Sequence, residues 1–239
     1  MSIFTFHLAE VSVMSAFKTL SNPPKADDVP GLIHMECMTS MTLGSRVFST
    51  SRLLIRQLAV FAQWENESFL DEFLKKDNFG KTLAKGWHTR LLFLRQWGKI
   101  NGFVIPQDTS ELDDPHAPVV AVTLARMKLF QVPRFISWGR PVEKLVRDHP
   151  GISMALAAIR LPRTVSTFSV WKSQLEMLEM VQGHSAIPQP KRHSEAMAER
   201  DRKDFHFQFT TLRFKPIAEY GKWDGRTHII PNLHTDQSL

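Results

Sequence analysis

The chain has 239 residues, of which 43% are hydrophobic and 23% are charged, the ordinary composition of a globular protein. Its formal net charge of +6 does not indicate a nucleic-acid-binding protein, because the basic residues are scattered among acidic ones, as in the run AERDRKDF. An anionic membrane surface is left open as a partner. The single cysteine, Cys37, excludes an intramolecular disulfide and a cysteine-based zinc site, and it favours a reducing compartment.

No apolar run reaches the roughly 18 residues that a membrane-spanning helix needs. The N-terminal run MSIFTFHLAEV has no basic start and no small residues after a long apolar segment. We therefore expect a first strand there and not a signal peptide. These patterns favour a protein that is soluble or lies against a membrane surface.

The first half alternates short apolar runs with helix-like runs. Asn22-Pro23-Pro24 ends the first helix, because proline cannot continue it, and Pro30-Gly31 turns the chain into the second strand. Residues 44–52 are expected to form a loop, and residues 98–118 lack periodicity, which is typical of a linker. The expected strands are residues 3–11, 32–43, 56–64 and 87–97, and the expected helices are residues 13–20, 66–76 and 81–85.

The second half repeats this order of elements. Ser173 is the expected N-cap of a helix, because its hydroxyl can accept a hydrogen bond from the first turn. Residues 183–191, with the sequence GHSAIPQPK, contain two prolines and are interpreted as an insertion. The expected strands are residues 119–127, 152–161, 164–171 and 205–214, and the expected helices are residues 131–147, 175–182 and 193–202.

Two landmarks align the halves: Pro30-Gly31 matches Pro150-Gly151, and Trp64 matches Trp171. Each half then reads as the split β-α-β pattern of ferredoxin-like folds. The predicted fold class is α+β, with two tandem ferredoxin-like repeats packed sheet to sheet as a body like a dimeric α+β barrel within one chain. The predicted domains are a first repeat at residues 1–105, a linker at residues 106–117 and a second repeat at residues 118–239.

Motifs of several enzyme classes are absent from the sequence. It contains no G-x-S-x-G, no G-x-G-x-x-G after a strand, no G-x-x-x-x-G-K-S/T and no H-E-x-x-H. Five histidines also lie at spacings that match no metal-ligand motif, so we expect surface or packed side chains. They are His34, His88, His116, His149 and His206.

His193 differs from these because it opens a helix on which Ala196 and Met197 follow on the same face. Small and sulfur-bearing neighbours leave room for a flat apolar cofactor, and imidazole is a common axial ligand of haem iron. A solvated or capping histidine at a helix N-terminus is the alternative, and spacing alone favours it. His184 is a weaker candidate because it lies in the insertion.

Several longer stretches are distinctive. They are PVVAVTLARMK at residues 118–128, PRFISWGRPVEKLVRDHPG at residues 133–151, RTVSTFSVWKSQLEM at residues 163–177, and HSEAMAERDRKDFHFQFTTLRF at residues 193–214 with Gly221-Lys222-Trp223 after it. With PGL, LAVFAQW and the Trp87 strand in the first half, the chain resembles the spheroidene monooxygenase family of haem-containing carotenoid oxygenases. The block at residues 193–214 carries the most specific part of this resemblance.

The resemblance implies a haem b cofactor, molecular oxygen and an electron donor such as reduced ferredoxin. It implies a monooxygenase that inserts oxygen into an acyclic carotenoid of the spheroidene type and gives a keto-carotenoid. His193 is then the proximal haem ligand, and Arg126, Lys128 and Arg200 are candidate partners of the haem propionates. The predicted localisation is cytoplasmic, and a lipophilic substrate implies peripheral contact with the inner membrane.

The chain departs from the family pattern at several positions. A glycine-rich stretch of the family is here MTSMTLGSRVF, the insertion at residues 187–192 precedes the histidine, and Leu124 replaces an expected arginine. These departures concern the substrate more than the fold. One alternative is therefore an α+β barrel protein that binds haem or a lipophilic ligand without carotenoid turnover. Another is a stress-type α+β barrel protein without a cofactor.

Overall fold

The computed structural model describes residues 1–44, 52–107, 114–202 and 204–233, and the side chains of all of these except residues 133, 136 and 200. Residues 45–51 of the predicted loop and residues 108–113 of the predicted linker thus lie outside the described residues. The first half contains β1 (Ile3–Glu10), α1 (Val13–Ser21), the 3-10 helix η1 (Ala26–Asp28), β2 (Leu32–Met41), β3 (Leu53–Trp64), α2 (Glu67–Lys76), α3 (Asn78–Ala84) and β4 (Trp87–Lys99).

The second half repeats the order of strands and helices. It contains β5 (Val119–Met127), the 3-10 helix η2 (Leu129–Gln131), α4 (Val132–Arg147), β6 (Ile152–Arg160), β7 (Thr164–Trp171), α5 (Gln174–Gln182), α6 (Arg192–Arg202) and β8 (His206–Tyr220). The strand, strand, helix, helix, strand order predicted for residues 152–214 is confirmed.

The eight strands form one closed antiparallel barrel in the order β1-β3-β2-β6-β7-β5-β8-β4. Within it, each half has the ferredoxin-like order, β4-β1-β3-β2 in the first and β8-β5-β7-β6 in the second. The inner faces of the two sheets meet inside the barrel, and the outer faces carry the helices. The predicted α+β fold of two ferredoxin-like repeats is therefore confirmed.

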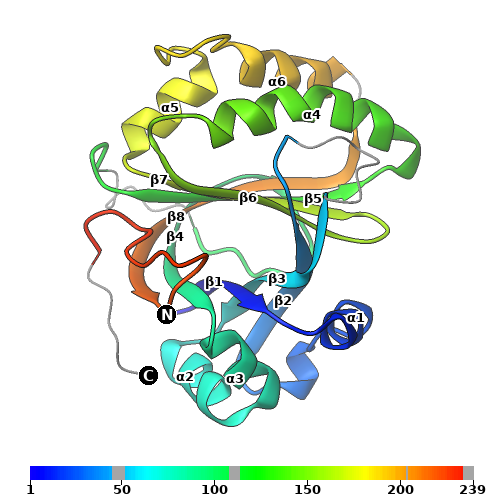
Figure 1. Cartoon of the computed structure of the whole chain (residues 1–239), viewed down its shortest axis with the longest axis vertical. Helices are drawn as coiled ribbons and strands as arrows, with labels where there is room; N and C mark the ends of the chain where they lie inside the picture. Colours follow the sequence, from blue (N-terminus) through cyan, green and yellow to red (C-terminus); the bar gives the residue numbers. More distant parts are fainter. Residues whose placement is uncertain (45–51, 108–113, 203, 234–239) are drawn as a thin grey trace.

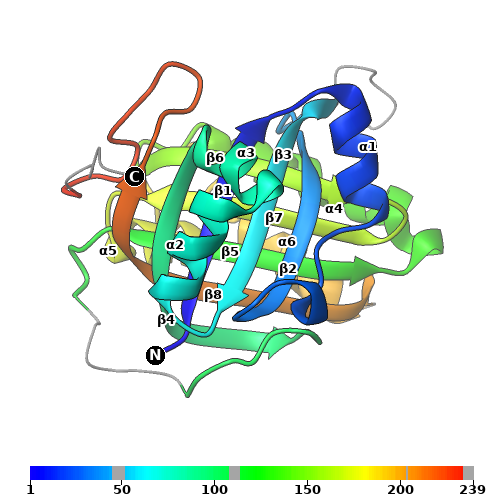
Figure 2. The same cartoon turned by 90° about the horizontal axis from the view of Figure 1, so that it is seen from below.

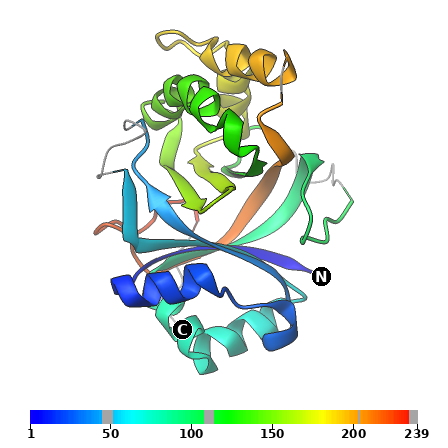
Figure 3. The ribbon, with the colours of Figure 1, turned by 90° about the vertical axis from the view of Figure 1, so that its right-hand side faces the viewer.

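The helices form two layers on opposite sides of the barrel. α4, α5 and α6 lie over the second half, and α1, α2 and α3 lie over the first half (Figures 1 and 3). The view from below shows the helices of the first half crossing the strands of their own sheet (Figure 2). Each layer thus belongs to one repeat, while the barrel belongs to both.

Aromatic rings from both halves fill the barrel. Phe6 of β1 stacks on Phe168 of β7, with ring centroids 3.8 Å apart. Phe4 packs against Phe61 and Phe214, at centroid distances of 5.8 and 5.0 Å. All five side chains have no more than trace exposure to solvent. Because burial of large apolar surface is the main favourable term in folding, this shared core holds the repeats together.

The two halves join along two unequal seams. β4 and β8 pair from His88 with Tyr220 to Lys99 with Phe209. β2 and β6 pair along residues 39–41 and 157–159. The segment after β4 also enters the barrel, where Phe103 is buried and the Val104 N–H donates to the side chain of Gln63 over 2.9 Å. Since strands of both halves share one sheet, the division into domains at residues 105 and 118 stays a prediction.

One local expectation is confirmed, and several predicted boundaries differ, among them the starts of β3 and α3 and the end of β8. Ser173 caps α5 by accepting a hydrogen bond from the Glu176 N–H over 3.2 Å. Cys37 is fully buried, and burial raises the pKa of its thiol. β8, expected to end at Phe214, continues to Tyr220, because Pro216 lies at a register shift opposite β4, where its missing N–H is tolerated. Among the described residues, no helix is long and apolar enough to span a membrane.

Candidate functional site

The outer face of the second sheet carries a row of small side chains, one from each strand. Ala157 lies opposite Thr167, Thr167 opposite Thr123, and Thr123 opposite Thr211. The hydroxyl oxygens of Thr123 and Thr211 are 3.3 Å apart. Because successive side chains of a strand alternate between faces, and Val122 lies in the barrel core, this row faces the helices. The adjacent row on this face is Ala155, Ser169 and Ala121.

We call these seven residues the platform. At one end of it Phe135 of α4 packs on a cluster that contains Met127 and Phe205. At the other end Leu145 of α4 and Met177 of α5 pack with Trp171 in a second apolar cluster. Between the clusters, Thr167 is exposed and Thr123 and Thr211 are partly exposed. Solvent therefore reaches the middle of the sheet on its helix-covered side.

The equivalent face of the first half is closed. Leu58, Val60 and Trp64 of β3 have no exposed surface, because Leu70 and Phe73 of α2 lie against this face in one apolar cluster. Large side chains thus seal the first helix layer onto its sheet. The small side chains of the platform leave the second layer open.

His193, the predicted haem ligand, lies at the start of α6 in the layer above the platform. Its side chain is half-buried, its Nδ1 atom is shielded from solvent, and Ala196, one turn later, is buried. The face of α6 that carries His193 and Ala196 is therefore turned away from solvent, and α6 packs against α4 and α5. α6 is tied to α4 by Arg134, whose Nε donates to the Glu199 carboxylate over 2.9 Å and whose guanidinium lies 4.5 Å from the Phe205 ring.

The other predicted site residues do not gather around His193. Lys128 follows β5 and is half-buried, and its backbone N–H donates to the Phe205 carbonyl over 2.9 Å. The side chain of Arg200 lies outside the described part of the chain. Arg126 shares the inward face of β5 with Leu124 and so points into the barrel. The sheet therefore separates Arg126 from His193, because the two residues lie on opposite faces of it.

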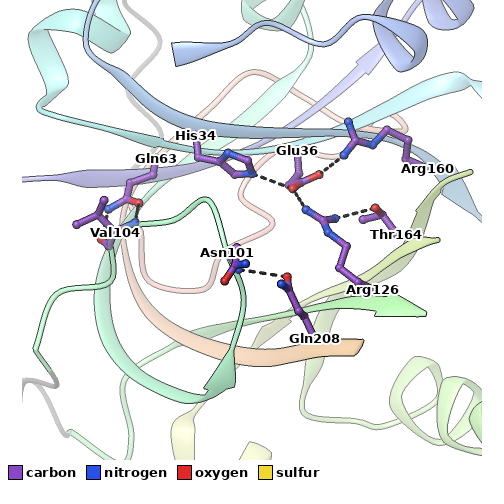
Figure 4. A network of polar contacts seen from close by, with 9 residues as sticks. All are labelled: His34, Glu36, Gln63, Asn101, Val104, Arg126, Arg160, Thr164 and Gln208. Carbon is purple, nitrogen blue, oxygen red and sulfur yellow. Dashed lines mark hydrogen bonds and ion pairs between the residues drawn. The ribbon is translucent and has the colours of Figure 1, made fainter. Parts of the chain in front are cut away.

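Inside the barrel, Arg126 belongs to a polar network centred on Glu36 (Figure 4). Its Nη1 donates to the Thr164 hydroxyl over 2.7 Å, and its Nη2 pairs with Glu36. The Glu36 carboxylate also contacts Nη2 of Arg160 and Nε2 of His34, each at 2.8 Å. Glu36 comes from the first repeat and both arginines from the second. The network therefore links β2 to β5 and β6 beside the shorter seam.

Glu36 has no exposed side-chain surface, whereas its partners are 22–28% exposed. Burial alone raises the pKa of this carboxyl group. Hydrogen bonds from His34 and Arg126, and the charges of Arg126 and Arg160, outweigh burial and hold the pKa of Glu36 at about 2. Glu36 is therefore ionised at neutral pH, and its single negative charge is shared between the two guanidinium groups.

The sequence interpretation missed both the platform and this network. Glu36 was recognisable, because a single carboxylate within the apolar run LIHMECM requires a cationic partner if the strand is buried. The platform had no such signal, since alanine, serine and threonine are common on exposed strands as well. In the described part of the chain, no three His, Cys, Asp or Glu side chains gather to bind a free metal ion.

The sequence matches no protein-family model and no curated protein. Among solved structures it is similar to an aldoxime dehydratase bound to butyraldoxime, with 8% identity, a TM-score of 0.46, and coverage of 90% of this chain and 79% of the other. It is also similar to a monooxygenase-like protein from Listeria innocua, with 12% identity, a TM-score of 0.28, and coverage of 88% of this chain and 94% of the other. A heme-degrading enzyme from Listeria monocytogenes is similar with 10% identity, a TM-score of 0.29, and coverage of 87% of this chain and 98% of the other. The resemblance to spheroidene monooxygenases stays a prediction.

Proposed function

We propose that this protein is a haem-dependent monooxygenase that holds haem between the platform and α6, with His193 as the axial ligand. The observations that carry the proposal are the open middle of the second sheet, where small side chains lie beneath the helix layer, and the half-buried histidine that α6 contributes to that layer.

The platform suits a flat ligand for steric reasons. Alanine, serine and threonine project little from a sheet, so a planar ring can approach the backbone closely and gain dispersion contacts over its whole face. The two apolar clusters rise at either end of the platform and limit how far such a ring can extend. A single imidazole is sufficient protein ligation for haem iron, so no cluster of metal ligands is required.

The chain's own residues have distinct roles in this proposal. His193 would fix the position of the haem, and the salt bridge between Arg134 and Glu199 would hold α6 at its distance from the sheet. Lys128 and Arg200 are proposed as partners of the haem propionates. Arg126 is not, because it pairs with Glu36 inside the barrel. Haem, when bound, supplies the oxygen chemistry, and the surrounding apolar side chains exclude bulk water from it.

The finer proposal is that the substrate is an acyclic carotenoid and the electron donor a reduced ferredoxin. Its support is the resemblance of residues 193–214 and the other matching stretches to spheroidene monooxygenases. Peripheral contact with a membrane follows from such a substrate and is part of the same proposal. The runner-up is a barrel that binds haem or a lipophilic ligand without turnover.

Haem reconstitution of the purified protein tests the binding site. We expect a Soret band that appears with one equivalent of haem, is lost or strongly shifted in His193→Ala, and persists in His184→Ala. Thr167→Phe should block binding by filling the platform, while Thr167→Ser should not, and both should keep the thermal stability of the parent. Unchanged spectra in both His193→Ala and Thr167→Phe would refute the proposed location.

Turnover is tested with the haem-loaded protein. Incubation with spheroidene, dioxygen and a ferredoxin reducing system should give a keto-carotenoid detectable by mass spectrometry, and labelled dioxygen should transfer its label to the product. If haem binds as predicted but no carotenoid product forms, the runner-up holds. If the label comes from water, a monooxygenase reaction is excluded.

A further inference from the structure

A second concave site lies on the outer side of the helix layer. It is a groove of about 520 Å³ between α4 and the connector from α5 to α6. This volume is in the range of sites that hold small molecules. The connector is the stretch that the sequence analysis interpreted as an insertion. The lining residues are Ser137, Arg140, Pro141, Lys144, Leu145, Asp148, Ile187, Pro188, Gln189 and Arg192.

The groove is separate from the platform. On α4, Phe135 and Val146 pack in the clusters that hold this helix to the second sheet. Lys144 lies two residues before Val146, which is a rotation of about 200° on a helix with 3.6 residues per turn. Most of the groove-lining stripe of α4 therefore points away from the sheet, and Leu145 at its edge packs in the apolar cluster beneath the helix. A ligand there and a haem on the platform would occupy opposite sides of the helix.

Positive charge dominates the groove. Arg140, Lys144 and Arg192 line it together with one carboxylate, Asp148, and Arg192 also pairs with Glu195 over 3.7 Å. Both oxygens of the Asp148 carboxylate accept hydrogen bonds from Arg147, at 2.6 and 2.7 Å. Arg147 does not line the groove, so the charge of Asp148 is already neutralised by a cation from outside it. The pKa of Asp148 is lowered by these bonds and by the charges of Arg147 and Lys144. The groove thus has cationic side chains in excess of its anionic ones.

Two features favour an anion in the groove. The Nε atom of Arg140 is shielded from solvent and has no hydrogen-bond partner among the described residues, so a bound acceptor would satisfy it. Arg192 is the first residue of α6, and the N-terminal end of a helix carries partial positive charge from unpaired N–H groups. The side chain of Arg192 is oriented by Gln189, which accepts from its Nε over 2.9 Å.

The rest of the lining is apolar. Pro141 and Leu145 come from α4, and Ile187 and Pro188 come from the connector. Ile187 also packs with the apolar cluster that contains Leu145 and Met177, so this wall is supported from behind. An apolar wall beside three cations suits a ligand that has a charged head and an apolar tail. We propose that the groove binds a small amphipathic anion, a carboxylate or phosphate monoester with a short alkyl chain, at a site independent of haem.

Isothermal titration of the haem-free protein tests this proposal with octanoate and octyl phosphate, below their micelle concentrations. We expect each of these two anions to bind saturably, with one molecule per chain. Octyltrimethylammonium, which has the same tail and the opposite charge, should bind at least tenfold more weakly. Acetate and inorganic phosphate, which have the heads without the tail, should also bind at least tenfold more weakly.

Matched variants locate the site. Arg140→Gln and Lys144→Gln should each weaken octanoate or octyl phosphate binding about tenfold or more, as expected for the loss of a charge-assisted hydrogen bond. Lys75→Gln, which removes one charge from the exposed surface of α2, should leave it unchanged. Ile187→Glu should abolish it. Equal binding of the ammonium compound, or full affinity in both groove variants, would overturn the proposal. Thr167→Phe should not alter this binding, which separates the result from the haem proposal.

Discussion

At the residue scale, one carboxylate joins the two repeats inside the barrel. Glu36 is fully buried between Arg126 and Arg160, so its removal leaves two guanidinium groups without their counter-charge. We expect Glu36→Gln to lower the free energy of unfolding by about 3 kcal/mol, measured by urea denaturation. Glu72→Gln, which breaks an exposed ion pair with Lys76, should change it by less than about 0.5 kcal/mol. Equal effects of the two variants would contradict a structural role for Glu36.

A pair of histidines provides the second residue-scale prediction. His7 and His88 lie opposite each other on β1 and β4, fully buried, with ring centroids 4.9 Å apart, and His88 also stacks on Tyr220. Burial is the main cause that lowers the pKa of both, with nearby positive charge adding to it, and the pKa of His88 falls to about 3. Both imidazoles are therefore neutral in the folded protein at neutral pH.

The sign of the pH dependence follows from these shifts. Between about pH 3 and 6.5 the unfolded chain binds a proton at His88 and the folded protein does not, so stability falls as the pH is lowered through this window. The lowered pKa of His7 acts in the same direction. Each histidine contributes up to about 1.4 kcal/mol per pH unit. Unfolding measured at pH 7, 6, 5 and 4 should show a shallower slope for His88→Phe than for the parent. Because carboxylates contribute to both proteins alike, parallel slopes would disprove the assignment.

The orientation of Arg126 shows what residue patterns cannot decide. Arg126 was recognised as a functional candidate, but both faces of β5 are largely buried, with Leu124 inside the barrel and Ala125 under the helices. Alternation of polar and apolar residues therefore could not tell which face Arg126 occupies. The contact between His7 and His88 also could not be predicted, because it depends on the pairing of two strands about 80 residues apart in the sequence.

At the element scale, the cap of α5 can be tested directly. Ser173 accepts from the Glu176 N–H, and its hydroxyl also lies 3.1 Å from the Glu176 carboxylate. Ser173→Ala should cost about 1 kcal/mol of unfolding free energy, because a helix N–H loses its acceptor. Ser173→Thr keeps the acceptor and should recover most of that loss. A measured cost below about 0.3 kcal/mol for the alanine variant would argue against this cap.

Strands and helices were predictable where local chemistry determines them. The predicted ends of β5 and β7 agree with the observed ones, because each strand is a compact apolar run bounded by polar or turn-forming residues. The end of β8 was misplaced for a physical reason. Pro216 signals the end of a strand in sequence, yet here β4 continues to pair on both sides of it through a shift in register. Such a shift depends on the neighbouring strand and leaves no local pattern.

At the scale of the whole molecule, the repeats and their packing into a barrel-like body could be predicted, but the lengths of the two seams could not. The landmarks Pro30-Gly31 and Pro150-Gly151 lie before β2 and β6, which confirms that the two units correspond. The seams between units involve pairs more than a hundred residues apart, and no local pattern encodes their length. The platform was missed for a related reason, since it depends on three strand pairings and on two helices above them.

The unequal seams predict where the barrel opens first. Residues 39–41 and 157–159 form a short ladder, whereas β4 and β8 pair along most of their length. Local opening requires less free energy where fewer bonds must break together. Amide hydrogen exchange under native conditions should therefore be at least tenfold faster in the short ladder than at residues 91–97 of β4. Equal protection of both seams would contradict this order of opening.

A pair of identical ferredoxin-like chains around a two-fold axis must have two identical seams and two identical helix layers. Linking both copies in a single polypeptide removes that constraint. Here one layer is sealed by leucine, valine and tryptophan while the other rests on alanine and threonine. Symmetry would require any cofactor to bind twice per barrel, whereas this asymmetric barrel is expected to take up a single equivalent of haem.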